Sequence, residues 1–81
     1  MDIKIRTQFK EFLIDCTHKD IGLYAQAGEL KNIVALGNNV QVLGKYETEK
    51  RAEEILNSIQ IAIEDGLKRQ SNGIIIEMPE K

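Results

Sequence analysis

The sequence predicts an α+β fold in which an antiparallel β-meander of about five short strands is followed by one long amphipathic helix and a final strand. Three observations predict it. Apolar and polar residues alternate through most of the first 46 positions, as in half-buried strands. After Thr48 the apolar spacing changes to a period near 3.6, which indicates a helix. The apolar run 74–76 then follows a polar turn, and strands that precede a helix favour an antiparallel sheet over a doubly wound one.

The first two strands are expected at residues 2–7 and 11–16, as antiparallel partners. In the first, Ile3, Ile5 and Thr7 share one side, and Lys4 and Arg6 share the other. In the second, the residues expected on one face are Phe12, Ile14 and Cys16, with Leu13 opposite them. The polar segment 16–20 then predicts a turn.

A third strand is expected at residues 21–27. Its alternation places four residues inward, namely Ile21, Leu23, Ala25 and Ala27. The side chains of Tyr24 and Gln26 are expected to face outward.

The runs 31–36 and 40–46 predict a hairpin. The three residues between them are Gly37, Asn38 and Asn39, which tolerate the positive φ values that tight hairpins use. Because residues 30–36 are apolar on both faces, this strand is expected in the middle of a sheet or under a second subunit.

The helix is expected from Glu49 to about Arg69, with the Thr48 hydroxyl as its amino-terminal cap. Its buried stripe is expected to contain Ala52, Ile55, Leu56, Ile59, Ala62, Ile63 and Leu67. Residues 70–73 are expected to end the helix, with Gly73 as the terminating residue, and residues 74–78 are expected to form the last strand. Since Ile75 lies in a run that is apolar on both faces, that strand also belongs mid-sheet or under a second subunit.

Length and charge restrict the functional classes. The 81 residues, of which 42% are hydrophobic and 30% charged, predict a single domain at residues 1–81. A formal charge of −2 without a basic block argues against nucleic-acid binding. No apolar run reaches the roughly 20 residues of a membrane span, and the lone cysteine agrees with a reducing compartment, so a cytoplasmic protein is expected. A small core without a disulfide leaves self-association as the expected source of extra stability, so a homo-oligomer is expected.

Two segments carry a resemblance. Residues 43–56 contain a Gly-x-Tyr-x-Thr-Glu-x-Arg-Ala turn that leads into the helix, and residues 76–80 read Ile-Glu-Met-Pro-Glu. Together they resemble a group of small uncharacterised proteins of phages and prophages of Gram-positive bacteria. The resemblance implies a small accessory protein that is made inside a bacterial cell and that binds a host protein or sequesters a signalling nucleotide. Because the shared motif is structural, it assigns no site residue.

The sequence offers no complete catalytic or metal site. Asp15, Cys16, His18 and Asp20 are the only cluster of suitable residue types, and the chain has no further cysteine or histidine to complete a zinc site or a nucleophile with its base. The glycines match neither the P-loop nor the dinucleotide-binding spacing. The prediction is therefore a protein that is not an enzyme and that carries no metal and no cofactor.

Two sets of residues are candidates for binding. Arginine and tyrosine supply a planar cation and a stacking surface for an anionic or aromatic ligand, and the candidates are Lys4, Arg6, Tyr24 and Arg51. The candidates for a protein interface are Ile61, which lies opposite the apolar stripe of the helix, and Ile75.

Three functions follow from these candidates. The first is a non-enzymatic accessory protein that binds and modulates a host component, such as one of antiviral defence. The second is a protein that holds a small nucleotide between subunits, which predicts a basic pocket at a subunit interface. The third is a self-associating structural protein without a ligand. A protein binder predicts an exposed apolar patch or an unpaired strand edge instead of a basic pocket.

Overall fold

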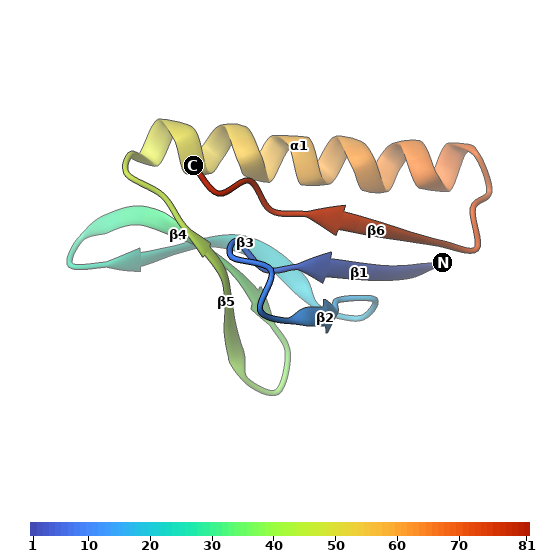
Figure 1. The fold of residues 1–81 in the computed structure, drawn as a ribbon, viewed down its shortest axis with the longest axis horizontal. Helices are drawn as coiled ribbons and strands as arrows, with labels where there is room; N and C mark the ends of the chain where they lie inside the picture. Colours follow the sequence, from blue (N-terminus) through green and yellow to red (C-terminus); the bar gives the residue numbers. More distant parts are fainter.

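The chain folds into two three-stranded sheets and a helix that packs against both of them (Figure 1). This computed structural model describes the backbone of residues 1–81 and every side chain except that of Gln26. The elements in chain order are β1 (Asp2–Arg6), β2 (Leu13–Asp15), β3 (Asp20–Gln26), β4 (Glu29–Leu36), β5 (Val40–Lys45), α1 (Glu49–Lys68) and β6 (Gly73–Glu77). Five strands, a helix and a final strand confirm the predicted α+β fold.

The first sheet has the strand order β2-β1-β6. β1 and β2 are antiparallel, as predicted, with Ile5 opposite Ile14. β6 is parallel to β1, with Ile3 opposite Ile74. All pairings among the first five strands are antiparallel, as predicted, but the final strand lies at an edge of its sheet, so the expected mid-sheet position of residues 74–76 is wrong. The alternative that a second subunit covers this strand stays a prediction. The physical reason is visible in Figure 1, where α1 carries the chain back to the end at which β1 begins, so that β6 runs in the direction of β1 along its free edge.

The second sheet is antiparallel and has the order β3-β4-β5. The predicted β4–β5 hairpin is confirmed, and β4 lies in the middle of this sheet, as its apolar residues on both faces indicated. The expected positive φ values at residues 37–39 are not present, since this loop closes without them. They occur in the β3–β4 hairpin instead, at Ala27 (φ 54°) and Gly28 (φ 80°), as a two-residue hairpin turn requires.

Two alanines expected to face inward are exposed. Ala27 belongs to the hairpin turn rather than to β3, which ends one residue earlier. Ala25 lies within the register shift of the β3–β4 pair, next to the turn of that hairpin. Ile21 and Leu23, at the other end of β3, do pack against the core as predicted.

The core lies between the helix and the two sheets. Its buried members are Ile5, Cys16, Ile33, Ala35, Leu43, Tyr46, Ala52, Ile55, Ile59 and Met78. The predicted helix stripe is correct except at Leu67, which is exposed. Gly66 occupies the buried position in that last turn, because a Cβ there would lie 2.9 Å from Ile74 Cγ2 and 3.0 Å from Met1 Sδ.

The two ends of α1 follow capping rules. Thr48 is the amino-terminal cap, as predicted, and its hydroxyl oxygen accepts a hydrogen bond from the Arg51 N–H at 3.0 Å. At the other end the Ser71 N–H donates to the Gly66 carbonyl at 3.0 Å, and the Gln70 N–H donates to the Leu67 carbonyl at 3.1 Å. This is a Schellman motif, and its left-handed position is occupied by Gln70 at φ 56°. The prediction of Gly73 as the terminating residue is therefore wrong, and Gly73 is the first residue of β6.

Replacing Gln70 with glycine is expected to raise the free energy of unfolding by about 0.5–1 kcal/mol, because glycine adopts left-handed φ values without the clash of a Cβ. Urea denaturation followed by circular dichroism measures the change. Arg69, one residue earlier, has right-handed helical dihedrals, so Arg69→Gly is the matched control and is expected to lower stability. Equal effects of the two substitutions would contradict the assignment of the cap.

Candidate binding surface

A short loop between β1 and β2 is held in one conformation by its own hydrogen bonds. The Thr7 N–H donates to the Phe12 carbonyl at 2.9 Å, and the Phe12 N–H donates to the Thr7 hydroxyl at 3.2 Å. Within the loop, the Lys10 N–H donates to the Thr7 carbonyl at 2.8 Å, and Lys10 adopts a left-handed φ of 62°. The backbone that carries residues 8–12 is therefore ordered before any ligand arrives.

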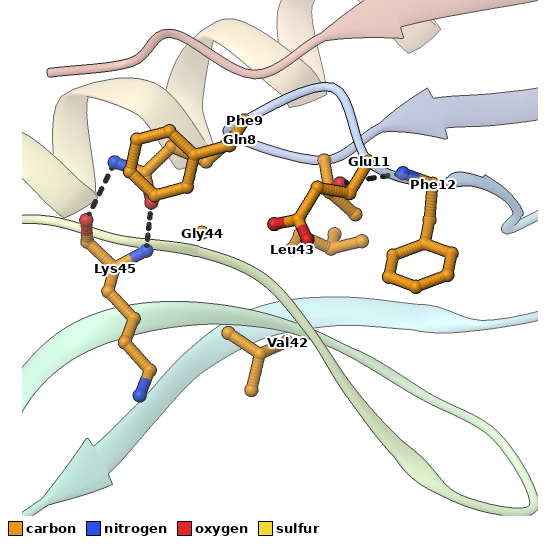
Figure 2. A pocket seen from close by; sticks show the side chains of 9 residues that line it. Gln8, Phe9, Glu11, Phe12, Val42, Leu43, Gly44 and Lys45 are labelled. Carbon is orange, nitrogen blue, oxygen red and sulfur yellow. Dashed lines mark hydrogen bonds between the residues drawn. The ribbon is translucent and has the colours of Figure 1, made fainter.

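Gln8 fixes this loop to the second sheet and to the carboxyl-terminal tail. Its backbone N–H donates to the Leu43 carbonyl at 2.9 Å. Its side-chain oxygen accepts from the Lys45 N–H at 2.8 Å, and its side-chain nitrogen donates to the Lys45 and Glu80 carbonyls at 2.8 and 2.7 Å. Figure 2 shows this amide facing the backbone of Lys45 as a neighbouring strand would. Gln8 is only 7% exposed, so these bonds form where water does not compete freely.

The fixed loop exposes two aromatic side chains. Phe9 and Phe12 are each 66% exposed, and Figure 2 shows their rings at opposite ends of this stretch of loop. Phe12, Leu13 and Val42 are exposed around two adjoining hollows of about 380 and 480 Å³, the first of which Phe9 also lines. We call the surface formed by Phe9, Phe12, Leu13 and Val42 the aromatic face. Phe12, which was expected to share a face with Ile14 and Cys16, lies just before β2 and is exposed, whereas Ile14 is half-buried and Cys16 is buried.

The aromatic face is large for a chain of this size. The exposed parts of its four side chains amount to roughly 400 Å² of apolar surface, in the range of functional patches on monomeric proteins. Val40 and Leu36, which lie opposite each other in the β4–β5 hairpin, are also exposed, and Val40 shares the face of β5 with Val42. The area of the aromatic face matches that of the largest apolar patch on a typical monomer, which is often functional.

Charged residues around the two hollows balance one another. The first hollow is lined by Glu11 and Lys45, and the second by Asp15 and Lys19. The Lys19 ammonium donates to the side-chain oxygen of Gln41 on β5. With equal numbers of acids and bases, the surface attracts neither strongly anionic nor strongly cationic ligands.

The predicted anion-binding residues do not form one site. Lys4 and Arg6 share the outer face of β1, where Arg6 Nε lies 3.3 Å from Glu77 Oε1. Tyr24 is exposed on β3 of the other sheet. Arg51 lies in the first turn of α1, where its Nε and Nη2 donate to the Lys81 carbonyl at 3.0 and 2.8 Å. Arg51 therefore has a backbone acceptor within the chain already, and Arg6 has an ion-pair partner.

The two predicted interface residues are exposed but lie apart from the aromatic face. Ile61 is 65% exposed on the side of α1 that faces away from the core. Ile75 is 62% exposed on β6, next to Lys4 of β1. Neither residue lines the two hollows beside the aromatic face.

The carboxyl-terminal tail is held by Tyr46 and Arg51 as well as by Gln8. The Tyr46 hydroxyl donates to the Pro79 carbonyl at 2.8 Å. Burial raises the pKa of this phenol, and the nearby charge of Arg51 offsets part of the increase. A third hollow, of about 580 Å³, lies beside this tail and is lined by acidic and basic residues together.

Stability is expected to decline at alkaline pH through Tyr46. Its pKa is higher in the folded protein than in the unfolded chain, so its contribution is complete below the unfolded value, about 10, and is lost as pH rises through the folded value. Denaturation measured between about pH 8 and pH 11 is expected to show a smaller loss for Tyr46→Phe than for the wild-type protein. Tyr24→Phe, at an exposed tyrosine, is the control. Identical pH profiles for wild type and Tyr46→Phe would refute this role.

The cluster around Cys16 is structural. Cys16 is 1% exposed, and burial raises the pKa of its thiol, which disfavours the reactive thiolate. The Asp15 carboxylate accepts hydrogen bonds from the hydroxyl and the N–H of Thr17, which hold its pKa below the ordinary value. Among the described residues, no three His, Cys, Asp or Glu side chains gather in a way that would hold a metal ion.

Sequence reasoning missed the aromatic face. The available signal was the run Phe12-Leu13-Ile14, three apolar residues in a strand where one face should be polar. Phe9 gave a second signal, because it is a large apolar residue within a polar loop.

No helix in the described chain combines the length and apolar character that crossing a bilayer requires. Comparison with family models, curated proteins and solved structures finds no match to this chain.

Proposed function

We propose that this protein is a non-enzymatic binding module that contacts another protein through the aromatic face. One observation carries the proposal: Phe9 and Phe12 are two-thirds exposed on a loop whose backbone is held by hydrogen bonds and by Gln8. Full burial of one such ring contributes about 1.5–3 kcal/mol, and about two thirds of that stabilisation is still available for binding, because each ring is 66% exposed. Aromatic side chains on an ordered backbone bind at a low cost in conformational entropy and commonly dominate protein interfaces.

The proposed partner is a component of a bacterial host cell, and the proposed place of action is the cytoplasm. The resemblance of residues 43–56 and 76–80 to phage and prophage proteins supports this context. Within it, the protein is proposed to modulate or inhibit the host component that it binds, such as one of antiviral defence.

Nucleotide sequestration has less support. All three arginines have partners in the chain, since Arg6 pairs with Glu77, Arg69 with Asp65 at 3.1 Å, and Arg51 with a backbone carbonyl. A phosphate would have to displace these contacts, and the charges around the aromatic face are balanced. The apolar surface therefore supports the protein binder more strongly.

The proposal is tested by capture from a lysate of Gram-positive bacterial cells. Immobilised protein is expected to retain one or a few host proteins, and an excess of free wild-type protein is expected to release them. Free protein with both Phe9→Ser and Phe12→Ser should fail to compete. If the doubly substituted protein competes as well as wild type does, the aromatic face is not the binding surface.

A further inference from the structure

β2 has a free edge beside the aromatic face. The Thr7 N–H donates to the Phe12 carbonyl at 2.9 Å, and the Cys16 N–H donates to the Ile3 carbonyl at 2.7 Å. These bonds direct the backbone groups of Phe12 and Cys16 toward β1. Because the backbone groups of a strand alternate in direction, those of Leu13 and Asp15 point toward the opposite edge. β2 is the outermost strand of its sheet, so these groups have no strand beside them.

The space next to this edge is open and partly apolar. The hollow of about 480 Å³ is lined by β2 on one side and by Gln41 and Val42 of β5 on the other. Phe12 and Val42 contribute exposed apolar side chains to it. An extended chain lying in this hollow would find hydrogen-bonding groups along β2 and apolar contacts beside them.

The protection of this edge against strand addition is limited to the shortness of β2 and the charge of Asp15. β2 has three residues and contains none of the lysines or prolines that commonly protect edge strands, and residues 12–14 are all apolar. The two charged residues that line the hollow, Asp15 and Lys19, are of opposite sign. An occupant that matches this charge balance is one without net charge.

We infer that the partner adds an extended segment along the free edge of β2, and that this segment is uncharged with apolar side chains at alternate positions. The inference rests on the proposed function and names the part of the partner that the aromatic face recognises. The backbone of Leu13 and Asp15 supplies affinity, and Phe12 and Val42 select the apolar side chains of the segment.

The test uses a pool of random linear peptides of about a dozen residues, selected on the wild-type protein. Leu13→Pro removes the N–H that points to the free edge and leaves the hydrogen bonds to β1 in place. Leu13→Ala is the matched control, because it shortens the same side chain and keeps the N–H. We expect the selected peptides to bind Leu13→Pro at least about tenfold more weakly than Leu13→Ala, which corresponds to the loss of one backbone hydrogen bond.

A second measurement does not depend on the folding of the proline variant. In wild-type protein, amide exchange followed by NMR is expected to be fast at Leu13 and Asp15 and to slow when a selected peptide is added. If peptides bind without protecting these amides, and Phe12→Ser abolishes their binding, strand addition is wrong while the aromatic face remains the binding surface. If Leu13→Pro instead dissociates a dimer of the free protein, the occupant is a second copy and the inference is overturned. Peptide binding that survives the combined Phe9→Ser and Phe12→Ser substitutions would overturn the inference and the proposed function together.

Discussion

Replacement of Gln8 by alanine is expected to lower the free energy of unfolding by about 3 kcal/mol. The side-chain amide makes three hydrogen bonds, two to the backbone of Lys45 and one to the Glu80 carbonyl. Each contributes about 1 kcal/mol net, and the loss is larger where the former partner is left without a replacement. Urea denaturation followed by circular dichroism measures the effect. Because Gln8 also holds the loop that carries Phe9 and Phe12, we expect partner binding to weaken as well.

Two further variants make this prediction specific. Gln60 is an exposed glutamine of α1 whose amide nitrogen lies 3.4 Å from Glu64 Oε1, so Gln60→Ala is expected to change stability by less than about 0.5 kcal/mol. Gln8→Glu keeps the acceptor for the Lys45 N–H but places a carboxylate against two carbonyl oxygens. Burial against these oxygens raises the pKa of the introduced carboxyl in the folded protein, so this variant is expected to recover stability as the pH falls from that raised value toward the unfolded value of about 4, because the protonated carboxyl donates again. A loss of less than about 1 kcal/mol for Gln8→Ala would contradict the role assigned to Gln8.

The combined Phe9→Ser and Phe12→Ser substitutions are expected to weaken binding of the captured host protein at least about 100-fold. Aromatic residues at the centre of an interface commonly contribute 2 kcal/mol or more each, and about 1.4 kcal/mol corresponds to a tenfold change in affinity. Stability should change by less than about 0.5 kcal/mol per substitution, because both rings are mostly exposed in the free protein. Isothermal titration calorimetry and urea denaturation of the same samples measure the two quantities.

The matched control carries Ile61→Ser and Leu67→Ser. These side chains are also large, apolar and exposed, at 65% and 59%, but they lie on α1 and line neither hollow beside the aromatic face. We expect this control to bind as the wild-type protein does. Equal losses of affinity in the two doubly substituted proteins would show that general surface hydrophobicity, rather than the aromatic face, drives binding.

The fold class, the β4–β5 hairpin and the helix with its Thr48 cap could be predicted from the sequence. These features depend on local periodicity and on local hydrogen bonds, which neighbouring residues determine. The direction and place of β6 could not be predicted in the same way. Ile74 pairs with Ile3, which lies near the other end of the chain, so no local pattern connects the two residues. An apolar strand also has the same sequence pattern at the edge of a sheet beneath a helix as in the middle of a sheet.

The candidate site was less predictable than the fold. Alternation placed Phe12 with Ile14 and Cys16 but could not predict that Phe12 is exposed, because exposure depends on which elements pack against that part of the face. The role of Gln8 depends on Lys45 and Glu80, which lie 37 and 72 positions away along the chain. Contacts over such sequence separations leave no periodic signal. Lys4, Arg6, Tyr24 and Arg51 were chosen for their chemistry, and the tertiary structure places them on three different elements.

Site-specific photo-crosslinking at Phe12 shows in a single experiment whether the aromatic face contacts a host protein. Phe12 is replaced by a photoreactive phenylalanine analogue, and the protein is irradiated in living bacterial cells. A parallel sample carries the analogue in place of Ile61, which is equally exposed. We expect a discrete crosslinked host protein from position 12 and no product of the same mass from position 61. The absence of a product at position 12, or the same product from both positions, would contradict the assignment of the aromatic face as the binding surface.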